Sequence, residues 1–158
     1  MSKPAHILLV EDNRFDIELT LDAFRESRLL NTIQVARNGG EALDYIFGNG
    51  QYADREAYPM PDLILLDLNL PGIDGHEVLR RIKMTPGLKR LPVIILTSSE
   101  EETDRALSYE SGANSYLRKP VSFEGFLKVI DRVGEYWLTL NIGPPKGVDE
   151  GAETNQGN

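Results

Sequence analysis

The segment PDLILLDLNLPGIDG, residues 61–75, carries an apolar run that ends abruptly on a carboxylate. Its four apolar residues, 63–66, are continuous rather than alternating, which is typical of a strand buried on both faces. Asp67 follows at once, and the pair Pro71-Gly72 indicates a turn soon afterwards. Asp67 is therefore either the first polar residue beyond a core strand or the centre of a site.

Similar apolar runs occur at intervals along the chain, with helical patterns between them. Apolar residues three and four apart, as in Ile17, Leu21 and Phe24, indicate helices that cover the strands. This alternation predicts an α/β fold with a parallel five-stranded sheet, because parallel strands need a crossover helix between them. We predict strands at residues 6–10, 32–36, 63–67, 93–97 and 115–119, and further helices around 42–47, 78–82, 100–112 and 122–140, the last with Ser122 at its N-cap.

Two segments do not fit this alternation. Residues 48–61, GNGQYADREAYPMP, form a long polar stretch, which predicts a loop that is either functional or mobile. Residues 143–158 contain proline, glycine and acids with almost no core-forming side chains, so we expect a disordered acidic tail. The folded domain is accordingly predicted to span residues 1–142.

Composition limits the classes of protein to which the chain can belong. With 158 residues it can form one domain with a core, and it is too short for two ordinary ones. The absence of cysteine excludes a disulfide framework, a thiol nucleophile and a cysteine zinc site. The net charge of -8 argues against nucleic acid as a partner. No apolar run reaches the roughly 20 residues that span a bilayer, and no signal-peptide pattern is present, so we expect a cytoplasmic protein without a membrane partner.

Polar side chains follow four of the predicted strands, at the same end of each. Glu11 and Asp12 come after the first strand, Asp67 ends the third, Thr97 ends the fourth and Lys119 ends the fifth. Each has an ordinary explanation when taken singly: the acidic pair could cap a helix, Thr97 could bond to the backbone, and Lys119 could be an exposed turn residue. Ligands of open parallel sheets bind at the carboxyl ends of the strands, so the coincidence favours a site.

The residue types at this edge suit phosphoryl transfer. Two carboxylates about 4 Å apart repel by about 4 kcal/mol at an effective dielectric constant of about 20, so a cluster of acids favours a bound cation. Oxygen ligands without Cys or His favour a hard ion such as Mg²⁺. Lys119 and Thr97 can bind phosphate oxygens while Asp67, rigid at its base and accessible at its tip, attacks the phosphorus in line.

Four stretches of the sequence together resemble the receiver domain of two-component response regulators. They are ILLVEDN, LILLDLNLPGIDGHEVLRRIK, LPVIILTSS and GANSYLRKPVS, which occur in the order and at the spacing of that family, and the resemblance covers about residues 5–140. It implies a flavodoxin-like (βα)5 doubly wound fold. It also implies a signalling protein that takes a phosphoryl group from a histidine kinase and catalyses only its own phosphorylation and dephosphorylation.

The same resemblance assigns roles to individual residues. Asp67 matches the family's phospho-acceptor, and Lys119 matches its lysine at the site. Thr97 and Tyr116 match the hydroxyl and the aromatic side chain of the family's conformational switch. The implied Mg²⁺ ligands are Glu11, Asp12, Asp67 and the main-chain carbonyl of Asn69.

The polar segment 48–61 and the extended C-terminus resemble the single-domain regulators paired with phytochromes, which implies a phytochrome-type histidine kinase as partner. An intermediate aspartate carrier in a multi-step phosphorelay is the alternative. A Mg²⁺-dependent phosphohydrolase is disfavoured, because Asn69 stands where such enzymes place a second acid. A flavin-binding electron carrier is disfavoured too, because Glu11 and Asp12 would repel the flavin phosphate.

The last predicted helix carries more apolar surface than one buried face needs. One stripe, which includes Phe126 and Ile130, can cover the sheet, and a second stripe includes Tyr136 and Leu140. An outward apolar patch marks a contact site in many proteins. We therefore predict a homodimer through Tyr136 and Leu140, unless these side chains fold back onto the domain's own loops.

Overall fold

A parallel sheet forms the middle layer of the molecule. The computed structural model describes residues 4–97, 115–118 and 122–142. Its strands are β1 (Ala5–Val10), β2 (Asn31–Ala36), β3 (Leu63–Asp67), β4 (Val93–Thr97) and β5 (Ser115–Arg118). They form a five-stranded sheet in the order β2-β1-β3-β4-β5, and all four pairings are parallel. The predicted α/β fold with a doubly wound parallel sheet is therefore confirmed.

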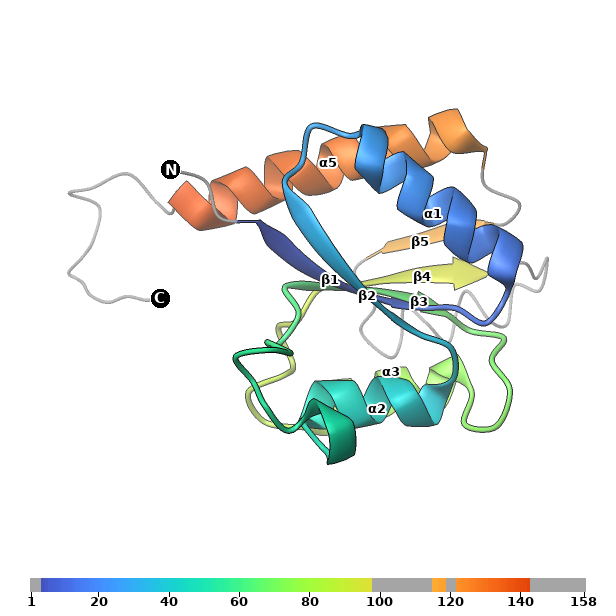
Figure 1. Ribbon diagram of the computed structural model, residues 1–158, viewed down its shortest axis with the longest axis vertical. Helices are drawn as coiled ribbons and strands as arrows, with labels where there is room; N and C mark the ends of the chain where they lie inside the picture. Colours follow the sequence, from blue (N-terminus) through green and yellow to red (C-terminus); the bar gives the residue numbers. More distant parts are fainter. Residues whose placement is uncertain (1–3, 98–114, 119–121, 143–158) are drawn as a thin grey trace.

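Helices cover both faces of the sheet (Figure 1). One layer contains α1 (Arg14–Glu26) and α5 (Phe123–Ile142), and the other contains α2 (Gly39–Phe47) and α3 (Gly75–Met84). The helix predicted at 100–112 lies outside the described residues, as do Lys119 and the tail at 143–158. Within the described part of the chain, none of the helices has the length and apolar character needed to cross a membrane.

The continuous apolar runs of the central strands supply two cores. In β3, Ile64 and Leu66 pack toward α2 and α3, whereas Leu63 and Leu65 pack toward α1 and α5. All five residues of β3 are buried. Alternate side chains of a strand point to opposite faces, so both sets of positions must be apolar when both faces are covered.

Polar side chains fix where the helices begin. Asn13, Asn38 and Asp74 are the N-caps of α1, α2 and α3, and each side chain accepts a hydrogen bond from the backbone N–H three residues on. The hydroxyl of Ser122 likewise accepts from the backbone N–H of Gly125, at 2.9 Å, which confirms the N-cap predicted for the last helix.

Residues 48–61, predicted as a polar loop, connect α2 to β3 with a single short helical turn, and we call them the annex. Gly48 ends α2 in the left-handed conformation, with φ of 67°, and a 3₁₀ turn, η1 (Gly50–Tyr52), follows. The Arg55 guanidinium donates hydrogen bonds to the carbonyl oxygens of Tyr45 and Ile46 at 2.8 and 3.0 Å. These are among the last carbonyls of α2, which lack partners within the helix, so the annex completes the end of α2.

Three tyrosine rings hold the annex against α2. The ring centroids of Tyr45 and Tyr52 are 4.9 Å apart, and those of Tyr52 and Tyr58 are 5.0 Å apart, in edge-on arrangements. Tyr52 is only 3% exposed. The annex therefore adds Tyr52 and Tyr58 to the core beneath α2 and α3, although its composition is polar.

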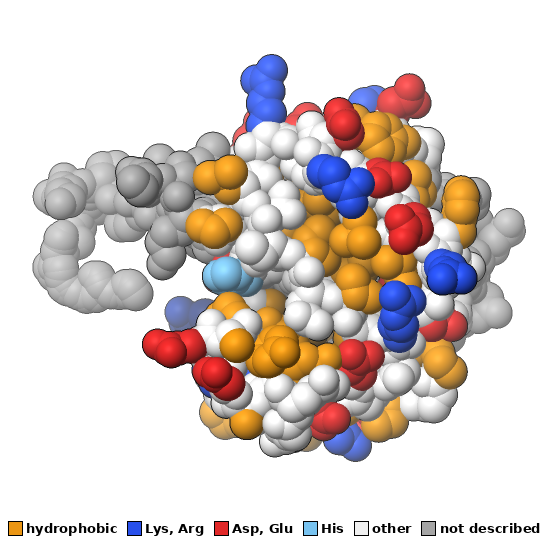
Figure 2. Space-filling model, in the orientation of Figure 1, with side chains coloured by type: hydrophobic (Ala, Val, Ile, Leu, Met, Phe, Trp, Pro, Cys, Tyr) orange, Lys and Arg blue, Asp and Glu red, His pale blue; other side chains and the backbone are white. Residues whose placement is uncertain are grey.

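The face of the molecule seen in Figure 2 carries Lys and Arg side chains interspersed with Asp and Glu. Apolar side chains gather between these charges near the middle of this face. On this face the described residues thus form no continuous basic surface, which is the kind of surface that binds nucleic-acid phosphates.

Candidate functional site

Asp67 is the last residue of the central strand β3. It is paired with Leu96 of β4, while β1 flanks β3 on the other side. Its Oδ1 accepts a hydrogen bond from the backbone N–H of Asn69 at 3.0 Å. Asp67 is only 3% exposed, so the expectation of an accessible tip is wrong.

Glu11 and Asp12 follow directly after β1. The backbone N–H of Glu11 donates to the carbonyl of Ala36 at 2.9 Å, and its carboxylate Oε2 accepts from the N–H of Asn13 at 3.1 Å. Glu11 is fully buried, whereas Asp12 is exposed. The N-cap of α1 is Asn13, whose Oδ1 accepts from the N–H of Asp16. Helix capping therefore does not account for the acidic pair.

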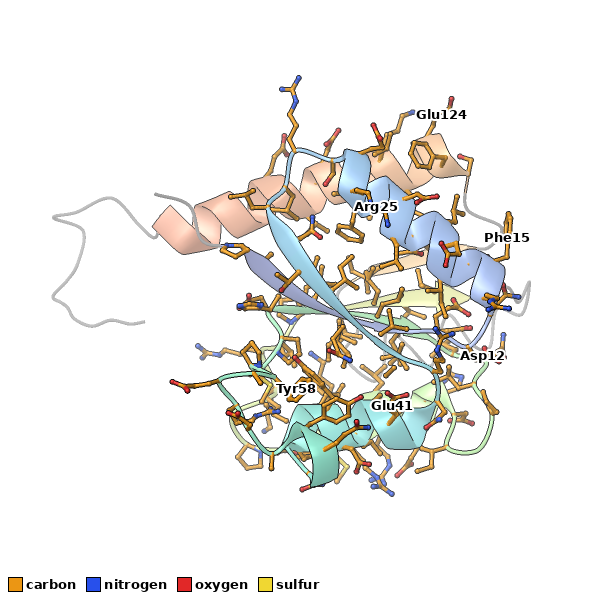
Figure 3. All side chains as sticks on the ribbon, viewed as in Figure 1. Asp12, Phe15, Arg25, Glu41, Tyr58 and Glu124 are labelled. Atoms are coloured by element: carbon orange, nitrogen blue, oxygen red, sulfur yellow. The ribbon has the colours of Figure 1, made fainter. Side chains whose placement is uncertain are left out.

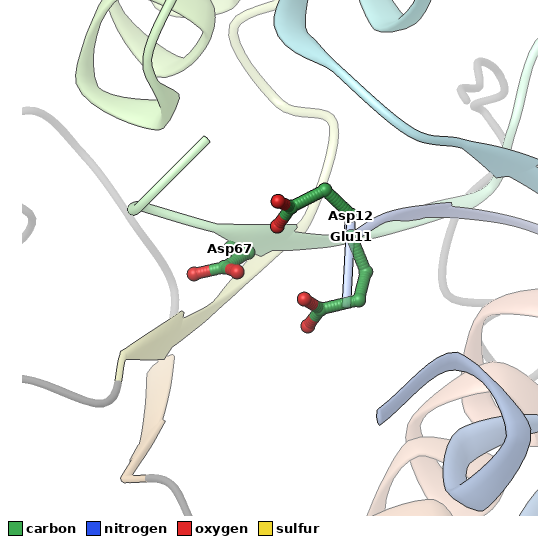
Figure 4. Close-up of side chains that lie close together, drawn as sticks. All are labelled: Glu11, Asp12 and Asp67. Atoms are coloured by element: carbon green, nitrogen blue, oxygen red, sulfur yellow. The ribbon is translucent and has the colours of Figure 1, made fainter. Parts of the chain in front are cut away.

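The three acids form one cluster (Figure 4). Glu11, Asp12 and Asp67 each offer an oxygen, and these three oxygens all lie within 4.8 Å of one another. The donor set consists of carboxylate oxygens alone, and two of the three residues are buried, so their mutual repulsion is poorly screened by water. This arrangement fits a hard divalent cation such as Mg²⁺, which is bound in proteins through a few carboxylates and completes its shell with water.

The turn after β3 is held by a glycine that the sequence patterns did not single out. The N–H of Gly75 donates to the carbonyl of Leu68 at 3.1 Å. A Cβ at Gly75 would lie 2.3 Å from the carbonyl oxygen of Asp67, so only glycine allows α3 to begin against the backbone of that aspartate. A sequence signal exists, because a glycine directly after the N-cap Asp74 is a poor choice for helix stability.

Gly39 makes a second close approach on the other side of this turn. A Cβ there would lie 2.1 Å from the carbonyl oxygen of Ile73. Gly39 is the first residue of α2. The turn that contains Asn69 therefore contacts the beginnings of α2 and α3.

Other predicted site residues are placed only in part. The backbone of Thr97 ends β4 opposite Arg118, and the backbone of Tyr116 lies in β5 opposite Ile95. The side chains of Thr97, Tyr116, Tyr136 and Leu140 lie outside the described part of the structure, and so does all of Lys119. The structure thus brings together the three acids beside Asn69. The roles of the Thr97 hydroxyl, the Lys119 amine and the Tyr116 ring remain predictions.

Comparison with known proteins identifies relatives of similar length. The family model for the response regulator receiver domain matches residues 7–131. The probable methanogenesis regulatory protein FilR2 of Methanothrix harundinacea is 40% identical over 141 residues, which cover 89% of this chain and 88% of FilR2. Response regulator Rcp1 of Synechocystis sp. is 41% identical over 135 residues, which cover 85% of this chain and 90% of Rcp1.

Solved structures agree with this similarity. The phosphorylated cyanobacterial phytochrome response regulator RcpA has a TM-score of 0.77 at 40% identity, covering 87% of this chain and 96% of RcpA. The Mn²⁺-bound form of Rcp1 has a TM-score of 0.74 at 40% identity, covering 86% of this chain and 96% of that one. Because the family model matches most of the chain and these relatives share both sequence and fold with it, the chain belongs to the response regulator receiver family.

Proposed function

We propose that this receiver domain accepts a phosphoryl group on Asp67 from a histidine kinase and transmits the signal by a change of conformation or of dimerisation. The observation that carries the proposal is the convergence of Glu11, Asp12 and Asp67 at the carboxyl edge of the sheet, with their oxygens within 4.8 Å. The crystal structure of phosphorylated RcpA, a relative at 40% identity, supports it. Beyond its own phosphorylation and dephosphorylation, we propose no catalysed reaction.

The proposed transfer requires the acceptor to be held still. An Asp67 oxygen forms a bond to phosphorus as the bond from phosphorus to the kinase histidine breaks, and the histidine nitrogen leaves with the electron pair. β3 fixes Asp67 from below, and the N–H of Asn69 binds its Oδ1. This hydrogen bond thus helps to orient the carboxylate that is proposed to attack the phosphorus.

We propose Glu11, Asp12, Asp67 and the main-chain carbonyl of Asn69 as the residues that hold Mg²⁺. When bound, the ion neutralises charge on the carboxylates and on the incoming phosphoryl oxygens. The Mn²⁺-bound structure of Rcp1 supports a divalent cation in this family. Lys119 is proposed to bind a phosphoryl oxygen by charge.

We propose a phytochrome-type histidine kinase in the cytoplasm as the phosphoryl donor, since RcpA is a cyanobacterial phytochrome response regulator. A kinase of another sensory class is the competing donor, because FilR2, a probable methanogenesis regulatory protein, is as similar at 40% identity. Nucleic acid and membranes are not proposed as partners, given the net charge of -8.

We also propose a homodimer through the distal half of α5. Phe126 and Ile130 are 3% and 1% exposed and pack into the core beneath α1 and α5, so the first apolar stripe of this helix is occupied within the domain. We propose that a partner subunit buries the second stripe, which includes Tyr136 and Leu140.

Asp67→Asn is expected to lose phosphorylation, because the amide cannot act as the nucleophile. Labelling by acetyl phosphate with Mg²⁺, and by a phosphorylated phytochrome-type kinase, should fall to background. Asp62→Asn is the matched control, since Asp62 lies at the opposite end of β3, where its Oδ2 accepts from the N–H of His6. Wild-type labelling of Asp67→Asn would refute the assignment of the acceptor. If acetyl phosphate labels the native protein but the phytochrome-type kinase does not, the proposed class of kinase is wrong.

Asp12→Ala is expected to weaken Mg²⁺ binding by about tenfold or more, because a ligand is lost. The metal-free variant should unfold at the same temperature as wild type or a few degrees higher, since one like-charge repulsion is relieved. Calorimetric Mg²⁺ titration and thermal unfolding measure the two effects. Glu56→Ala removes the same charge from an exposed position of the annex and should change neither. Wild-type Mg²⁺ affinity in Asp12→Ala would contradict the proposed ligand set.

Thr97→Ala is expected to accept phosphate and to lose the conformational response. The proposed reason is that the Thr97 hydroxyl moves to the phosphoryl group and vacates space for Tyr116. Amide exchange over residues 97–118, with and without beryllofluoride, measures this response. Thr85→Ala removes a hydroxyl at the end of α3 and serves as control. A beryllofluoride response equal to that of wild type in Thr97→Ala would exclude this role.

Leu140→Asp is expected to convert the dimer into a monomer, because a charge would be buried in the proposed contact. Light scattering at micromolar concentration, with and without beryllofluoride, gives the mass. Leu30→Asp is the matched control, since Leu30 is an exposed leucine, 56% accessible, between α1 and β2. A native protein that stays monomeric in both conditions, or a dimeric Leu140→Asp, would rule out this interface.

A further inference from the structure

A single side-chain hydrogen bond joins the annex to the first turn of α2. The Tyr52 hydroxyl donates to Oε2 of Glu41 at 2.7 Å. The edge-on contacts of the Tyr52 ring with Tyr45 and Tyr58 fix the position of this hydroxyl. Burial and the hydrogen bond to Glu41 raise the pKa of Tyr52 to about 12, so the hydroxyl keeps its proton and remains a donor at neutral pH.

The other oxygen of Glu41 holds the connection between β2 and α2. Oε1 accepts from the backbone N–H of Arg37 at 3.0 Å, and the N–H of Glu41 donates to the Asn38 side chain at 2.8 Å. One carboxylate therefore ties the annex to residues 36–39, which we call the junction. Figure 3 places Glu41 on α2, with Tyr58 of the annex to one side and Asp12 at the sheet edge to the other.

The junction contacts the backbone of Glu11 at one end and the turn after Asp67 at the other. At its first residue, the carbonyl of Ala36 accepts from the N–H of Glu11 at 2.9 Å. At its last residue, Gly39 lies against the Ile73 carbonyl so closely that a Cβ would come within 2.1 Å of that oxygen. Ile73 belongs to the turn that begins after Asp67 and contains Asn69. A displacement of the junction would therefore change the spacing between Glu11 and this turn.

We propose that Tyr52 and Glu41 are positioning residues for the acidic site, and that the annex sets the geometry of metal binding and phosphoryl transfer through them. This inference rests on the function proposed above and names a part of the chain that regulates the same site. The proposed route runs from the Tyr52 hydroxyl to Glu41, from Glu41 to the junction, and from the junction to Glu11 and the turn containing Asn69. Mg²⁺ binding is sensitive to small displacements of the ligands, because the ion demands near-ideal octahedral geometry.

Tyr52→Phe tests the proposal, because it removes the hydroxyl and keeps the ring. Partners of metal ligands affect binding by about tenfold or more, and Tyr52 acts one step further out, so we expect about threefold to tenfold weaker Mg²⁺ binding. Phosphorylation by acetyl phosphate at fixed, subsaturating Mg²⁺ should slow by a similar factor. Amide exchange at residues 36–39 and 68–75 of the metal-free protein should become faster, which is a readout independent of activity.

Tyr45→Phe is the matched control within the same cluster of rings. Its hydroxyl donates to the carbonyl of Pro59 at 2.8 Å, which is a contact with the annex that does not involve Glu41. If the annex merely stabilises the fold, Tyr45→Phe and Tyr52→Phe should lower thermal stability alike and leave Mg²⁺ binding unchanged. The proposal requires that only Tyr52→Phe changes Mg²⁺ affinity and exchange at the junction.

The double variant Tyr52→Phe/Glu41→Ala tests whether Tyr52 acts through Glu41. Its Mg²⁺ affinity should equal that of Glu41→Ala alone, because the hydroxyl has no remaining route to the junction. Additive losses would overturn the route, and equal Mg²⁺ affinities of Tyr52→Phe and Tyr45→Phe would overturn the inference while the proposed function stands. If the native protein neither binds Mg²⁺ nor accepts phosphate, the proposed function is wrong and this inference is overturned with it.

Discussion

The burial of β3 on both faces is the constraint on which the acidic cluster depends. Burying one Leu or Ile side chain contributes about 1.5 to 3 kcal/mol, so the four apolar residues of β3 contribute on the order of 6 to 12 kcal/mol. A close pair of carboxylates opposes this with about 4 kcal/mol at an effective dielectric constant of about 20. Three acids form three such pairs, so their repulsion is of the same order as the burial of β3, and a bound cation would offset part of it.

Much of this arrangement could be predicted from the sequence because it follows from short patterns. The continuous apolar runs predict strands covered on both faces, and in parallel strands the residues that follow each run must meet at one edge. This reasoning places Glu11, Asp12 and Asp67 together, as the structure shows. The near-complete burial of Asp67 could not be predicted in this way, because it depends on how the loops close over the strand end rather than on the strand itself.

The annex shows why sequence patterns do not predict some features of the structure. Tyr45 lies in α2, Tyr52 in η1 and Tyr58 beyond η1, so the period of a single helix or strand does not relate them. From the sequence, Arg55 is expected to be a solvent-exposed charge, but its guanidinium donates hydrogen bonds to carbonyls at the end of α2. Gly39 is required by the backbone of Ile73, which approaches from a distant part of the chain, so the local sequence does not identify this contact.

The unequal exposure of the three acids has a consequence for how the site can work. Glu11 and Asp67 are buried, and their positions are fixed by backbone hydrogen bonds to Asn13 and Asn69, whereas Asp12 is exposed. Two ligands are thus held in advance, and one remains in contact with solvent at the edge of the sheet. Rigid ligands lower the entropy lost on binding, while an exposed ligand can exchange water for an ion without opening the core. The proposed cation could therefore exchange at the edge of the sheet while Asp67, the proposed nucleophile, stays in one orientation.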